Sequence, residues 1–404
     1  MLARLKKLGP GLLFAGAAIG VSHLVQSTRA GADFGWGLLW ALLLVNLFKY
    51  PFFQFGPRYA LATGESLLDG YYKLGKIYLW LYFILNIATM FTIQTAVTIV
   101  TAGLASNLFN TSADIIYWSI GVTVTCYIIL LIGRYQLLDK VIKAIVIVLT
   151  ISSVLALMIA TTKGNASLEF RQVFPEGAGL LFVIAFMGWM PAPMDISIWH
   201  SIWVLEKKKG LKNKLSLKEG LFDFNVGYLT TVILGICFVG LGAMVMFDSG
   251  IEFSDKGNEF AGQLIELYTS NLGEAWYGVI AIAALTTMIS TTITTLDASP
   301  RVMSKTIQLL FKQKNKDYYM LLITILALGT CLIFLFLLSE MGLLVQIATV
   351  LSFMTAPFYA ILNYRLITSK HMPIIDRPSE KIKILSILGI IFLAGFTGVY
   401  LLSL

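Results

Sequence analysis

Charged residues are scarce in this chain of 404 residues. Asp, Glu, Lys and Arg together make up 13% of it, whereas hydrophobic residues make up 57%, and the mean hydropathy is +0.81. Soluble globular domains carry about 25% charged residues, so the deficit excludes a soluble protein and predicts a polytopic membrane protein surrounded by lipid. The chain also has no basic aqueous domain that could bind nucleic acid, so its net charge of +8 does not indicate a nucleic-acid partner.

Motifs of enzymes and of cofactor sites are absent as well. The chain has no phosphate-binding Gly-Lys-Ser loop and no nucleophile elbow. Its longest predicted inner loop, residues 204–221, is too short to form a catalytic domain. The cysteines lie within apolar runs at wide spacing, which offers neither a disulfide framework nor a thiolate metal site; they are Cys126, Cys237 and Cys331. We therefore expect no enzyme and no cofactor.

What the chain does contain is a series of long apolar runs. Most of them are close to the ~20 residues that an α-helix needs to cross the hydrocarbon core. They comprise residues 12–31, 35–57, 77–105, 115–133, 141–161, 178–203, 222–247, 275–296, 319–339, 342–364 and 384–403. The sequence therefore predicts an all-α membrane protein with eleven transmembrane helices, organised as one transporter domain over residues 1–404.

The distribution of Lys and Arg predicts the orientation. Most of the 30 basic residues fall in alternate loops, and basic residues stay on the cytoplasmic side of short loops; these loops lie at residues 1–9, 58–76, 134–143, 204–221, 301–316 and 365–383. This pattern places the N-terminus in the cytoplasm and the C-terminus outside. We expect a monomeric integral protein of a bacterial inner (plasma) membrane.

Two of the apolar runs are interrupted in their middles. The first is broken at residues 19–23 by Ile-Gly-Val-Ser-His, and the sixth at residues 190–195 by Met-Pro-Ala-Pro-Met-Asp. A break inside the bilayer frees backbone groups that must meet protein, water or a ligand, and paired breaks in corresponding helices indicate a transport site. Helices 1–5 and 6–10 then form an inverted repeat over residues 10–162 and 178–366, with the helix at 384–403 outside it.

Several short motifs, in this order and at this topology, resemble the natural resistance-associated macrophage proteins (Nramp). The resemblance is carried by Gly9-Pro10-Gly11, Ala30-Gly31-Ala32, Asn46-Leu47, Arg58 with Thr63-Gly64, and His200-Ser201. It implies a LeuT-like fold and proton-coupled transport of divalent metal. It also implies a glutamine near the metal in helix 10, at Gln346, and in the LeuT-like fold a sodium site is often found near the hydroxyl-rich end of helix 8, at residues 290–295.

The site of this chain departs from the family pattern. The family's Asp-Pro-Gly-Asn motif of helix 1 falls on Gly20, Val21, Ser22 and His23, so the metal-binding aspartate is absent. In helix 6, the family's methionine falls on Pro193, with Met194 one position away, and its first histidine falls on Asp195.

A divalent cation that leaves water still needs oxygen or nitrogen ligands and charge compensation. Our hypothesis is that Asp195 replaces the missing carboxylate, that His23 is a nitrogen ligand or a proton acceptor, and that the carbonyls of Gly20 and Pro191 complete the shell. The candidate substrate-binding residues are Gly20, Ser22, His23, Pro191, Pro193, Met194, Asp195 and Gln346. Without a soft sulfur ligand, manganese or magnesium is favoured.

Coupling candidates come from the few ionisable residues inside the predicted helices. Lys49 lies near the centre of helix 2, where a charge is costly. It either snorkels or pairs away from the pathway, or it permanently occupies a cation position. His23, Asp195 and His200 are the other candidates, and H⁺ or Na⁺ is the expected coupling ion, although helix 3 contains no Asp or Glu between residues 77 and 107.

These features predict a secondary active symporter that takes up a divalent cation by alternating access. The first alternative is a proton- or sodium-coupled carrier of a small organic solute such as an amino acid. The second is a sensor that binds without transport, or a channel.

Overall fold

The computed structural model describes residues 9–111, 113–133, 135–163, 170–210, 216–250, 253–254, 256–313, 315–337 and 340–403. Of the predicted inner loops, residues 1–8, 134, 211–215 and 314 lie outside this part. The described residues form helices and no strands. The elements are α2 (Pro10–Ala18), η1 (Ser22–Ser27), α3 (Thr28–Phe34), α4 (Leu39–Thr63), α5 (Leu67–Leu74), α6 (Lys76–Leu108), α7 (Ile115–Leu131), α8 (Tyr135–Lys163), α9 (Ala178–Trp189), α10 (Ile196–Gly210), α11 (Leu217–Val245), α12 (Gly257–Leu272), η2 (Glu274–Trp276), α13 (Tyr277–Leu310), α14 (Tyr319–Phe336), α15 (Met341–Thr368), η3 (Ile374–Asp376) and α16 (Glu380–Ser403).

Length and apolar composition mark many of these helices as membrane spans. Six described helices pass as single spans, and a seventh span is the bent pair Pro10–Ala18 and Ser22–Phe34. Helices α4, α7, α8 and the α9–α10 pair occupy the other four predicted spans. The predicted all-α, LeuT-like architecture is confirmed.

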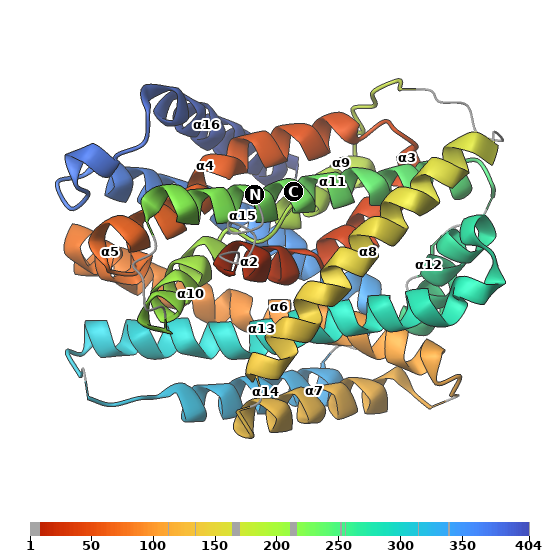
Figure 1. Ribbon diagram of the computed structural model, residues 1–404, viewed down its shortest axis with the longest axis horizontal. Coiled ribbons are helices and arrows are strands. Elements are labelled where there is room, and N and C mark those ends of the chain that lie inside the picture. Colours follow the sequence, from red (N-terminus) through yellow and green to blue (C-terminus); the bar gives the residue numbers. More distant parts are fainter. Residues whose placement is uncertain are drawn as a thin grey trace.

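The long helices run roughly along the long axis of the molecule (Figure 1). Two short helices that the sequence did not predict, α5 and α12, lie at opposite ends of it. Helix α5 begins with a capping box, in which Ser66 and Asp69 bond to each other's backbone amides, so it is fixed at the inner end. These additions cover the ends of the spans and leave their centres to the site.

Helix 1 lies at the centre of the packing because α11 contacts all of its parts, α2, η1 and α3. The backbones approach closely: a Cβ atom on Gly11 would lie 2.0 Å from the carbonyl oxygen of Asp223, and one on Gly227 would lie 2.0 Å from that of Gly11. Glycine is therefore required at this crossing. The contact holds α2 against the first turns of α11.

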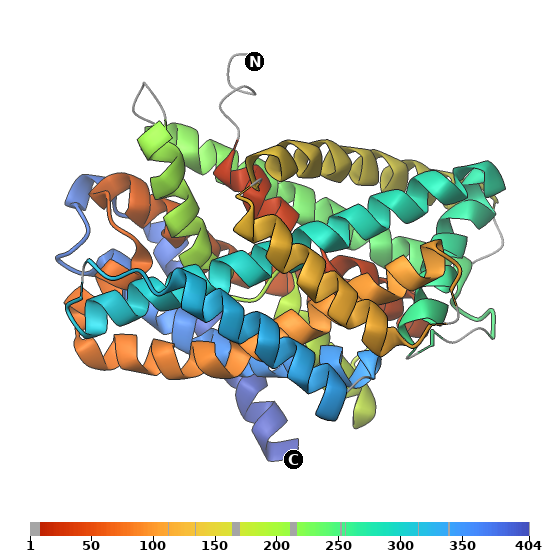
Figure 2. The same ribbon diagram turned by 90° about the horizontal axis from the view of Figure 1, so that it is seen from below.

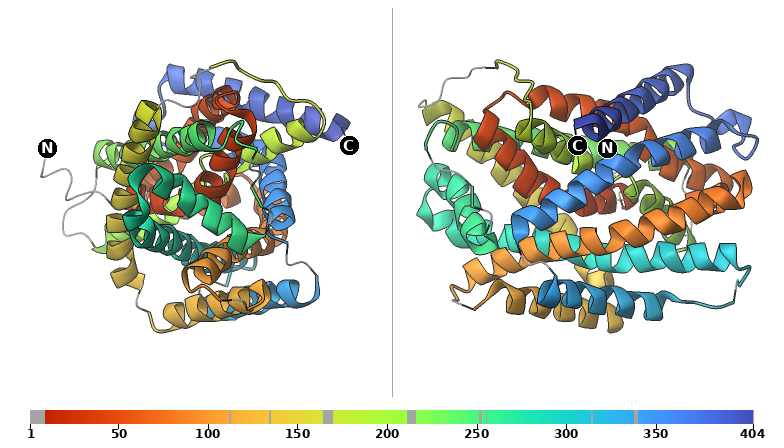
Figure 3. Two further views of the ribbon diagram at one scale, coloured as in Figure 1. Left: turned by 90° about the vertical axis from the view of Figure 1, so that its right-hand side faces the viewer. Right: turned by 180° about the vertical axis from the view of Figure 1, so that it is seen from behind.

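Peripheral helices complete the bundle. Helices α7 and α14 pack against each other along one edge (Figures 1 and 3). Helix α16 packs on α4 and α15, and its end projects from the body of the molecule (Figure 2). Their outward side chains are large and apolar, among them Leu328 of α14 and Ile391 of α16, each more than half exposed. Such a surface suits lipid rather than water.

Candidate functional site

The break in helix 1 is shorter than the predicted interval 19–23. Regular α-helix ends at Ala18, Ile19 is extended, and helical geometry resumes at Val21, so only Ile19 and Gly20 are unwound. Ser22 and His23 begin the π-helical turn η1, and the axis bends by 51°. The wider π turn marks a local departure from the α-helical hydrogen-bond ladder, a feature frequent at functional sites.

The break in helix 6 covers the predicted interval. Helix α9 ends at Trp189 and α10 begins at Ile196, with an extended backbone at Met190 and a cis bond between Met190 and Pro191. Asp195 occupies the position before α10, and its carbonyl accepts hydrogen bonds from the amides of Ile198 and Trp199 at 2.8 and 3.3 Å. Two prolines remove backbone donors here, so the chain cannot remain helical.

The two breaks share one buried cavity. Gly20, Val21 and Ser22 line it from helix 1, and Pro193 lines it from the helix 6 break. Its volume is about 20 Å³. A direct but long contact also joins the breaks, since the Ser22 hydroxyl lies 3.4 Å from the carbonyl oxygen of Pro191. The structure therefore brings Gly20, Ser22, Pro191 and Pro193 together, as the sequence predicts.

The remaining wall of this cavity comes from residues outside the two breaks. Ile93 and Val97 contribute from α6, Trp189 and Trp199 flank the helix 6 break, and Thr291 and Thr295 contribute from α13. The Thr291 hydroxyl lies 3.3 Å from the carbonyl oxygen of Ile19. The Thr295 hydroxyl donates to the Gln94 amide oxygen at 2.6 Å. Only the hydroxyl-rich run at residues 290–295 pointed to this wall from sequence, because apolar linings carry no motif.

Asp195 is buried, with 3% of its surface exposed. Its Oδ1 atom has no hydrogen-bond partner among the described residues. It lines a second pocket with Thr89, Pro193, Ser352 and Tyr359, on the side of the break that faces α6 and α15. A buried carboxylate oxygen without a partner is costly, so Asp195 is the strongest candidate in the site for binding a cation.

Lys49 is fully buried and does not snorkel. Its ammonium donates hydrogen bonds of 2.7 Å to the carbonyl oxygens of Met187 and Gly188, and lies 3.4 Å from that of Ala192. These carbonyls belong to the last turn of α9 and the break that follows, where the helix dipole is negative. Asp195 also attracts it electrostatically. Lys49 therefore stabilises the broken end of α9.

His23 points away from both pockets. Its Nε2 atom lies 2.9 Å from the carbonyl oxygen of Thr231 on α11, and its Nδ1 atom lies 2.8 Å from the Ser22 hydroxyl and 3.2 Å from the carbonyl oxygen of Ala18. The Gly20 carbonyl is also engaged, because it accepts from the amides of His23 and Leu24. His23 therefore contacts backbone carbonyls, whereas Asp195 lines a pocket.

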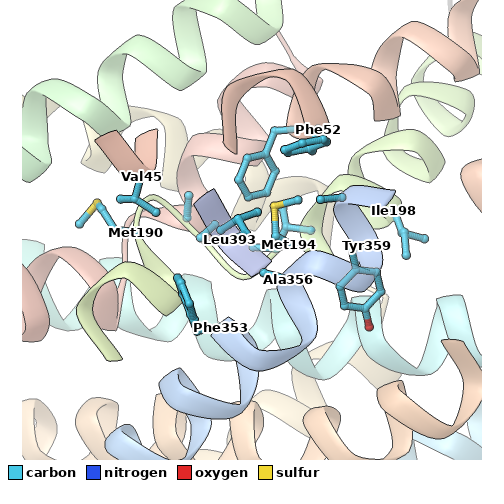
Figure 4. Close-up of a cluster of buried hydrophobic side chains, with 14 of the residues drawn as sticks. Val45, Phe52, Met190, Met194, Ile198, Phe353, Ala356, Tyr359 and Leu393 are labelled. Atoms are coloured by element: carbon cyan, nitrogen blue, oxygen red, sulfur yellow. The ribbon is translucent and has the colours of Figure 1, made fainter. Parts of the chain in front are cut away.

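The other predicted residues occupy different surroundings. Met194 belongs to the hydrophobic cluster that contains Phe52 and Leu393 (Figure 4). His200 is buried one turn into α10, and its ring stacks on Phe14 at 5.6 Å. Gln346 lies in a separate cavity of about 350 Å³ with Gln26, Arg29 and Glu340. The structure does not bring these three residues into the small central cavity.

A larger cavity of about 790 Å³ lies at the other end of the bundle. It is bounded by α5, α10, α13 and the start of α14, and charged residues of both signs line it, including Asp69, Glu206, Lys305 and Lys316. Lys305 pairs with Asp69 at 3.0 Å. The small central cavity thus lies between this wide cavity and the narrower one that Gln346 lines.

No three His, Cys, Asp or Glu side chains converge anywhere in the described ranges. A cation held in this site would therefore depend mainly on hydroxyl, amide and carbonyl oxygens, with Asp195 as its carboxylate. Oxygen ligands of this kind suit hard cations.

Comparison with known proteins gives concordant results. The family described as natural resistance-associated macrophage protein-like (Nramp) matches residues 11–403. An uncharacterized protein of Pasteurella multocida is 37% identical over 401 residues, which cover 98% of this chain and 91% of that protein. The divalent metal cation transporter MntH of Staphylococcus saprophyticus is 24% identical over 343 residues, which cover 81% of this chain and 75% of that protein.

Solved structures show the same fold. A mutant of the manganese transporter of Eremococcus coleocola superposes with a TM-score of 0.75 at 15% identity, covering 96% of this chain and 84% of that chain. The likeness extends to transporters of the wider LeuT-like fold.

Proposed function

The chain belongs to the natural resistance-associated macrophage protein-like family, and on that premise we propose that it is a secondary active transporter that moves a hard divalent cation, manganese or magnesium, into the cell by alternating access. Its family is one of metal-ion transporters, and the chain is an integral membrane protein. The observation that carries the proposal is the small cavity that both helix breaks line.

The size of this cavity favours an ion over an organic solute. About 20 Å³ is room for one water-sized species, whereas pockets for small organic ligands measure roughly 300–1,000 Å³. The walls are also rigid and aromatic at Trp189 and Trp199. An amino acid would require the two breaks to separate widely.

The donor atoms favour a hard ion. Ser22, Thr291 and Thr295, which carry hydroxyls, line the small cavity, and Asp195 lines the pocket beside it. Met194 also lines that second pocket, but its side chain packs within the hydrophobic cluster. Cadmium and other soft ions gain little from such a ligand set, whereas manganese and magnesium prefer it.

The positions of the cavities support alternating access. The wide cavity and the narrower one that Gln346 lines lie at opposite ends of the bundle, with the small cavity between them. Basic residues such as Lys208, Lys305 and Lys316 line the wide one, which supports placing it on the cytoplasmic side, with a cytoplasmic N-terminus and an outer C-terminus in a bacterial inner membrane. A membrane potential of 100 mV, negative inside, favours inward movement of a divalent cation by about 4.6 kcal/mol.

We propose that residues 1–404 act as one monomeric transport domain, with the repeats 10–162 and 178–366 moving against each other. For coupling to H⁺ or Na⁺, the candidates remain Asp195, His23, Lys49 and His200. Asp195 has the strongest support, because its free oxygen faces a pocket.

Uptake into proteoliposomes tests the proposal. Mn²⁺ entry is followed by quenching of an enclosed fluorophore, with Mg²⁺ and Cd²⁺ as competitors and imposed H⁺ or Na⁺ gradients as drivers. Saturable Mn²⁺ uptake that Mg²⁺ inhibits more strongly than Cd²⁺ supports the proposal. Flux without saturation indicates a channel, and binding without flux indicates a sensor. Gradient-driven uptake of radiolabelled amino acids without Mn²⁺ uptake would show that the substrate is an organic solute and not a metal ion.

A further inference from the structure

Unpartnered polar atoms gather on the side of Asp195 that faces α6 and α15. They are the hydroxyls of Tyr82 and Tyr359, both side-chain atoms of the Asn86 amide, and Oδ1 of Asp195, and none has a hydrogen-bond partner among the described residues. The four side chains are between 0 and 3% exposed. Each buried polar group left without a partner costs about 1–3 kcal/mol, so several together in one place require an explanation.

These groups lie close together. The rings of Tyr82 and Tyr359 meet edge to face with centroids 6.1 Å apart, and Tyr359 lines a pocket with Asp195. Asn86 is four residues beyond Tyr82, on the same face of α6. Thr89, the next residue on that face, lines a pocket with Asp195 and Tyr359.

A neighbouring phenol shows how this protein satisfies a buried hydroxyl when it serves only packing. The Tyr71 hydroxyl donates to the Asn363 amide oxygen at 2.5 Å. Asn363 in turn donates to the carbonyl oxygen of Phe52 and to the Ser197 hydroxyl, at 3.3 and 3.1 Å. The cluster around Asp195 lacks such a network, although it lies in the same layer of the bundle.

Together these groups form an oxygen-rich ligand set. Asp195 offers a free carboxylate oxygen, Asn86 an amide oxygen, and the two phenols offer neutral oxygens. Figure 4 shows the Tyr359 ring extending from α15 with its hydroxyl directed away from Phe52 and Met194. One carboxylate, whose charge the Lys49 ammonium partly compensates, among neutral oxygens binds a hard cation without trapping it, which suits a transport site.

Building on the transport function proposed above, we propose that Asp195, Tyr82, Asn86 and Tyr359 form the binding site for the hard divalent cation. The cation then lies between α6, α10 and α15, beside the helix 6 break and next to the small cavity that both breaks line, since Ile93 and Pro193 border both pockets. This placement accounts for the missing helix 1 carboxylate, because the ligands come from α6 and α15 instead.

The site is closed in this structure. The pocket beside Asp195 has a volume of ≈ 0 Å³, so the ligands must separate to admit an ion. Asp195 belongs to the unwound segment that joins α9 to α10, which is the part able to move relative to α6 and α15. Opening of the site is therefore coupled to movement of the helix 6 break.

Equilibrium Mn²⁺ binding to the full-length protein in nanodiscs tests this placement, with free Mn²⁺ measured by electron paramagnetic resonance and Mg²⁺ added as competitor. The variants are Tyr82→Phe, Tyr359→Phe and Asn86→Leu, and the matched control is Tyr71→Phe, which removes a phenol that already has a partner. We expect each of the three to weaken Mn²⁺ binding about tenfold or more and the control to bind as the wild type does.

Thermal unfolding of the same samples keeps folding and binding apart. Removing an unpartnered buried hydroxyl leaves the apo-protein as stable as before or more so, so the Tyr82→Phe and Tyr359→Phe variants stay folded. Unchanged Mn²⁺ affinity in all three variants, with binding lost in Asp195→Asn, overturns this site but leaves metal transport standing. A wild type that neither binds nor transports Mn²⁺ or Mg²⁺ overturns both.

Discussion

The ammonium of Lys49 donates a 2.7 Å hydrogen bond to the carbonyl oxygen of Gly188, within the last turn of α9. A fully buried positive charge on helix 2 thus stabilises the carbonyls that the helix 6 break leaves without amide donors. The same charge attracts Asp195 across the break. Lys49 therefore joins a structural role to charge compensation.

Substituting Lys49 tests this relationship directly. Lys49→Met keeps the length of the side chain but removes the charge and all donors, so the carbonyls of Met187 and Gly188 lose their partner and Asp195 loses a counter-charge. Breaking a buried charge interaction costs about 3–5 kcal/mol. We expect a markedly lower Tm for the purified protein in detergent, measured by intrinsic fluorescence.

A double-mutant cycle separates the two effects of Lys49. Adding Asp195→Asn to Lys49→Met removes the uncompensated carboxylate, so the double variant should regain part of the lost Tm. Strictly additive losses in the cycle would show that Lys49 acts only as a helix cap and does not compensate Asp195.

The narrow gap between Gly20 and Thr291 predicts a steric effect at the cavity. A Cβ atom on Gly20 would lie 3.0 Å from both Cγ2 and Oγ1 of Thr291, which is too close for ordinary contact, so Gly20→Ala should displace α13 from the helix 1 break. We expect a lower maximal rate of Mn²⁺ uptake in proteoliposomes.

The partner substitution provides the control for Gly20. Thr291→Ala removes both contacting atoms, so the Gly20→Ala, Thr291→Ala double variant should transport better than Gly20→Ala alone. Equal defects in the single and double variants would mean that the volume of this cavity does not limit transport.

His23 is expected to act through the backbone rather than through the metal. His23→Leu leaves the carbonyl of Thr231 without its side-chain donor, whereas that of Ala18 keeps the Ser22 hydroxyl; the loss costs about 1–3 kcal/mol for the buried group. We expect a lower Tm and less folded protein, while the KM for Mn²⁺ of the folded fraction changes less than about twofold. A large rise in KM at unchanged Tm would instead support the predicted nitrogen ligand.

The carboxylate of Asp223 holds the N-terminal end of helix 1. Its two carboxylate oxygens accept from the amides of Gly9 and Gly11 at 2.9 and 2.8 Å, and hydrogen bonds to a charged group contribute about 1.5–3 kcal/mol each. Asp223→Ala should therefore raise hydrogen–deuterium exchange in a peptide covering α2 by more than tenfold.

Two comparisons make the Asp223 experiment specific. Asp223→Asn keeps one acceptor and should give a smaller increase in exchange than Asp223→Ala. Peptides from α14, which lies at the periphery, should be unaffected in both. Unchanged exchange in α2 would show that the glycine crossing with α11 alone holds this end of helix 1.

Much of the site was predictable because breaks in apolar helices leave a local signature. The prolines at 191 and 193 fixed the limits of the helix 6 break, and the structure confirms them. Gly20 indicated the helix 1 break, but its extent was predicted too long, because a π turn absorbs Ser22 and His23. Such a turn depends on what packs beside it, here the Thr231 carbonyl and Thr291.

The roles of individual polar residues were harder to predict. Lys49 and Asp195 were both selected from sequence as charges inside the membrane. The carbonyls that Lys49 contacts lie 138 or more residues away along the chain, and the ligands proposed beside Asp195 lie on helices with no acidic motif. Tyr82, Asn86 and Tyr359 were not selected at all. Tyrosine and asparagine in an apolar helix are common packing residues, so only the absence of partners distinguishes them.

The sequence by itself determined the class of the protein and the two places where the backbone must leave the helix, because each depends on local composition and on the hydrogen-bonding needs of a chain in lipid. The tertiary structure alone decided which way His23 turns, what Lys49 holds and where the free oxygen of Asp195 points. Those outcomes depend on carbonyls and side chains that packing brings in from distant helices.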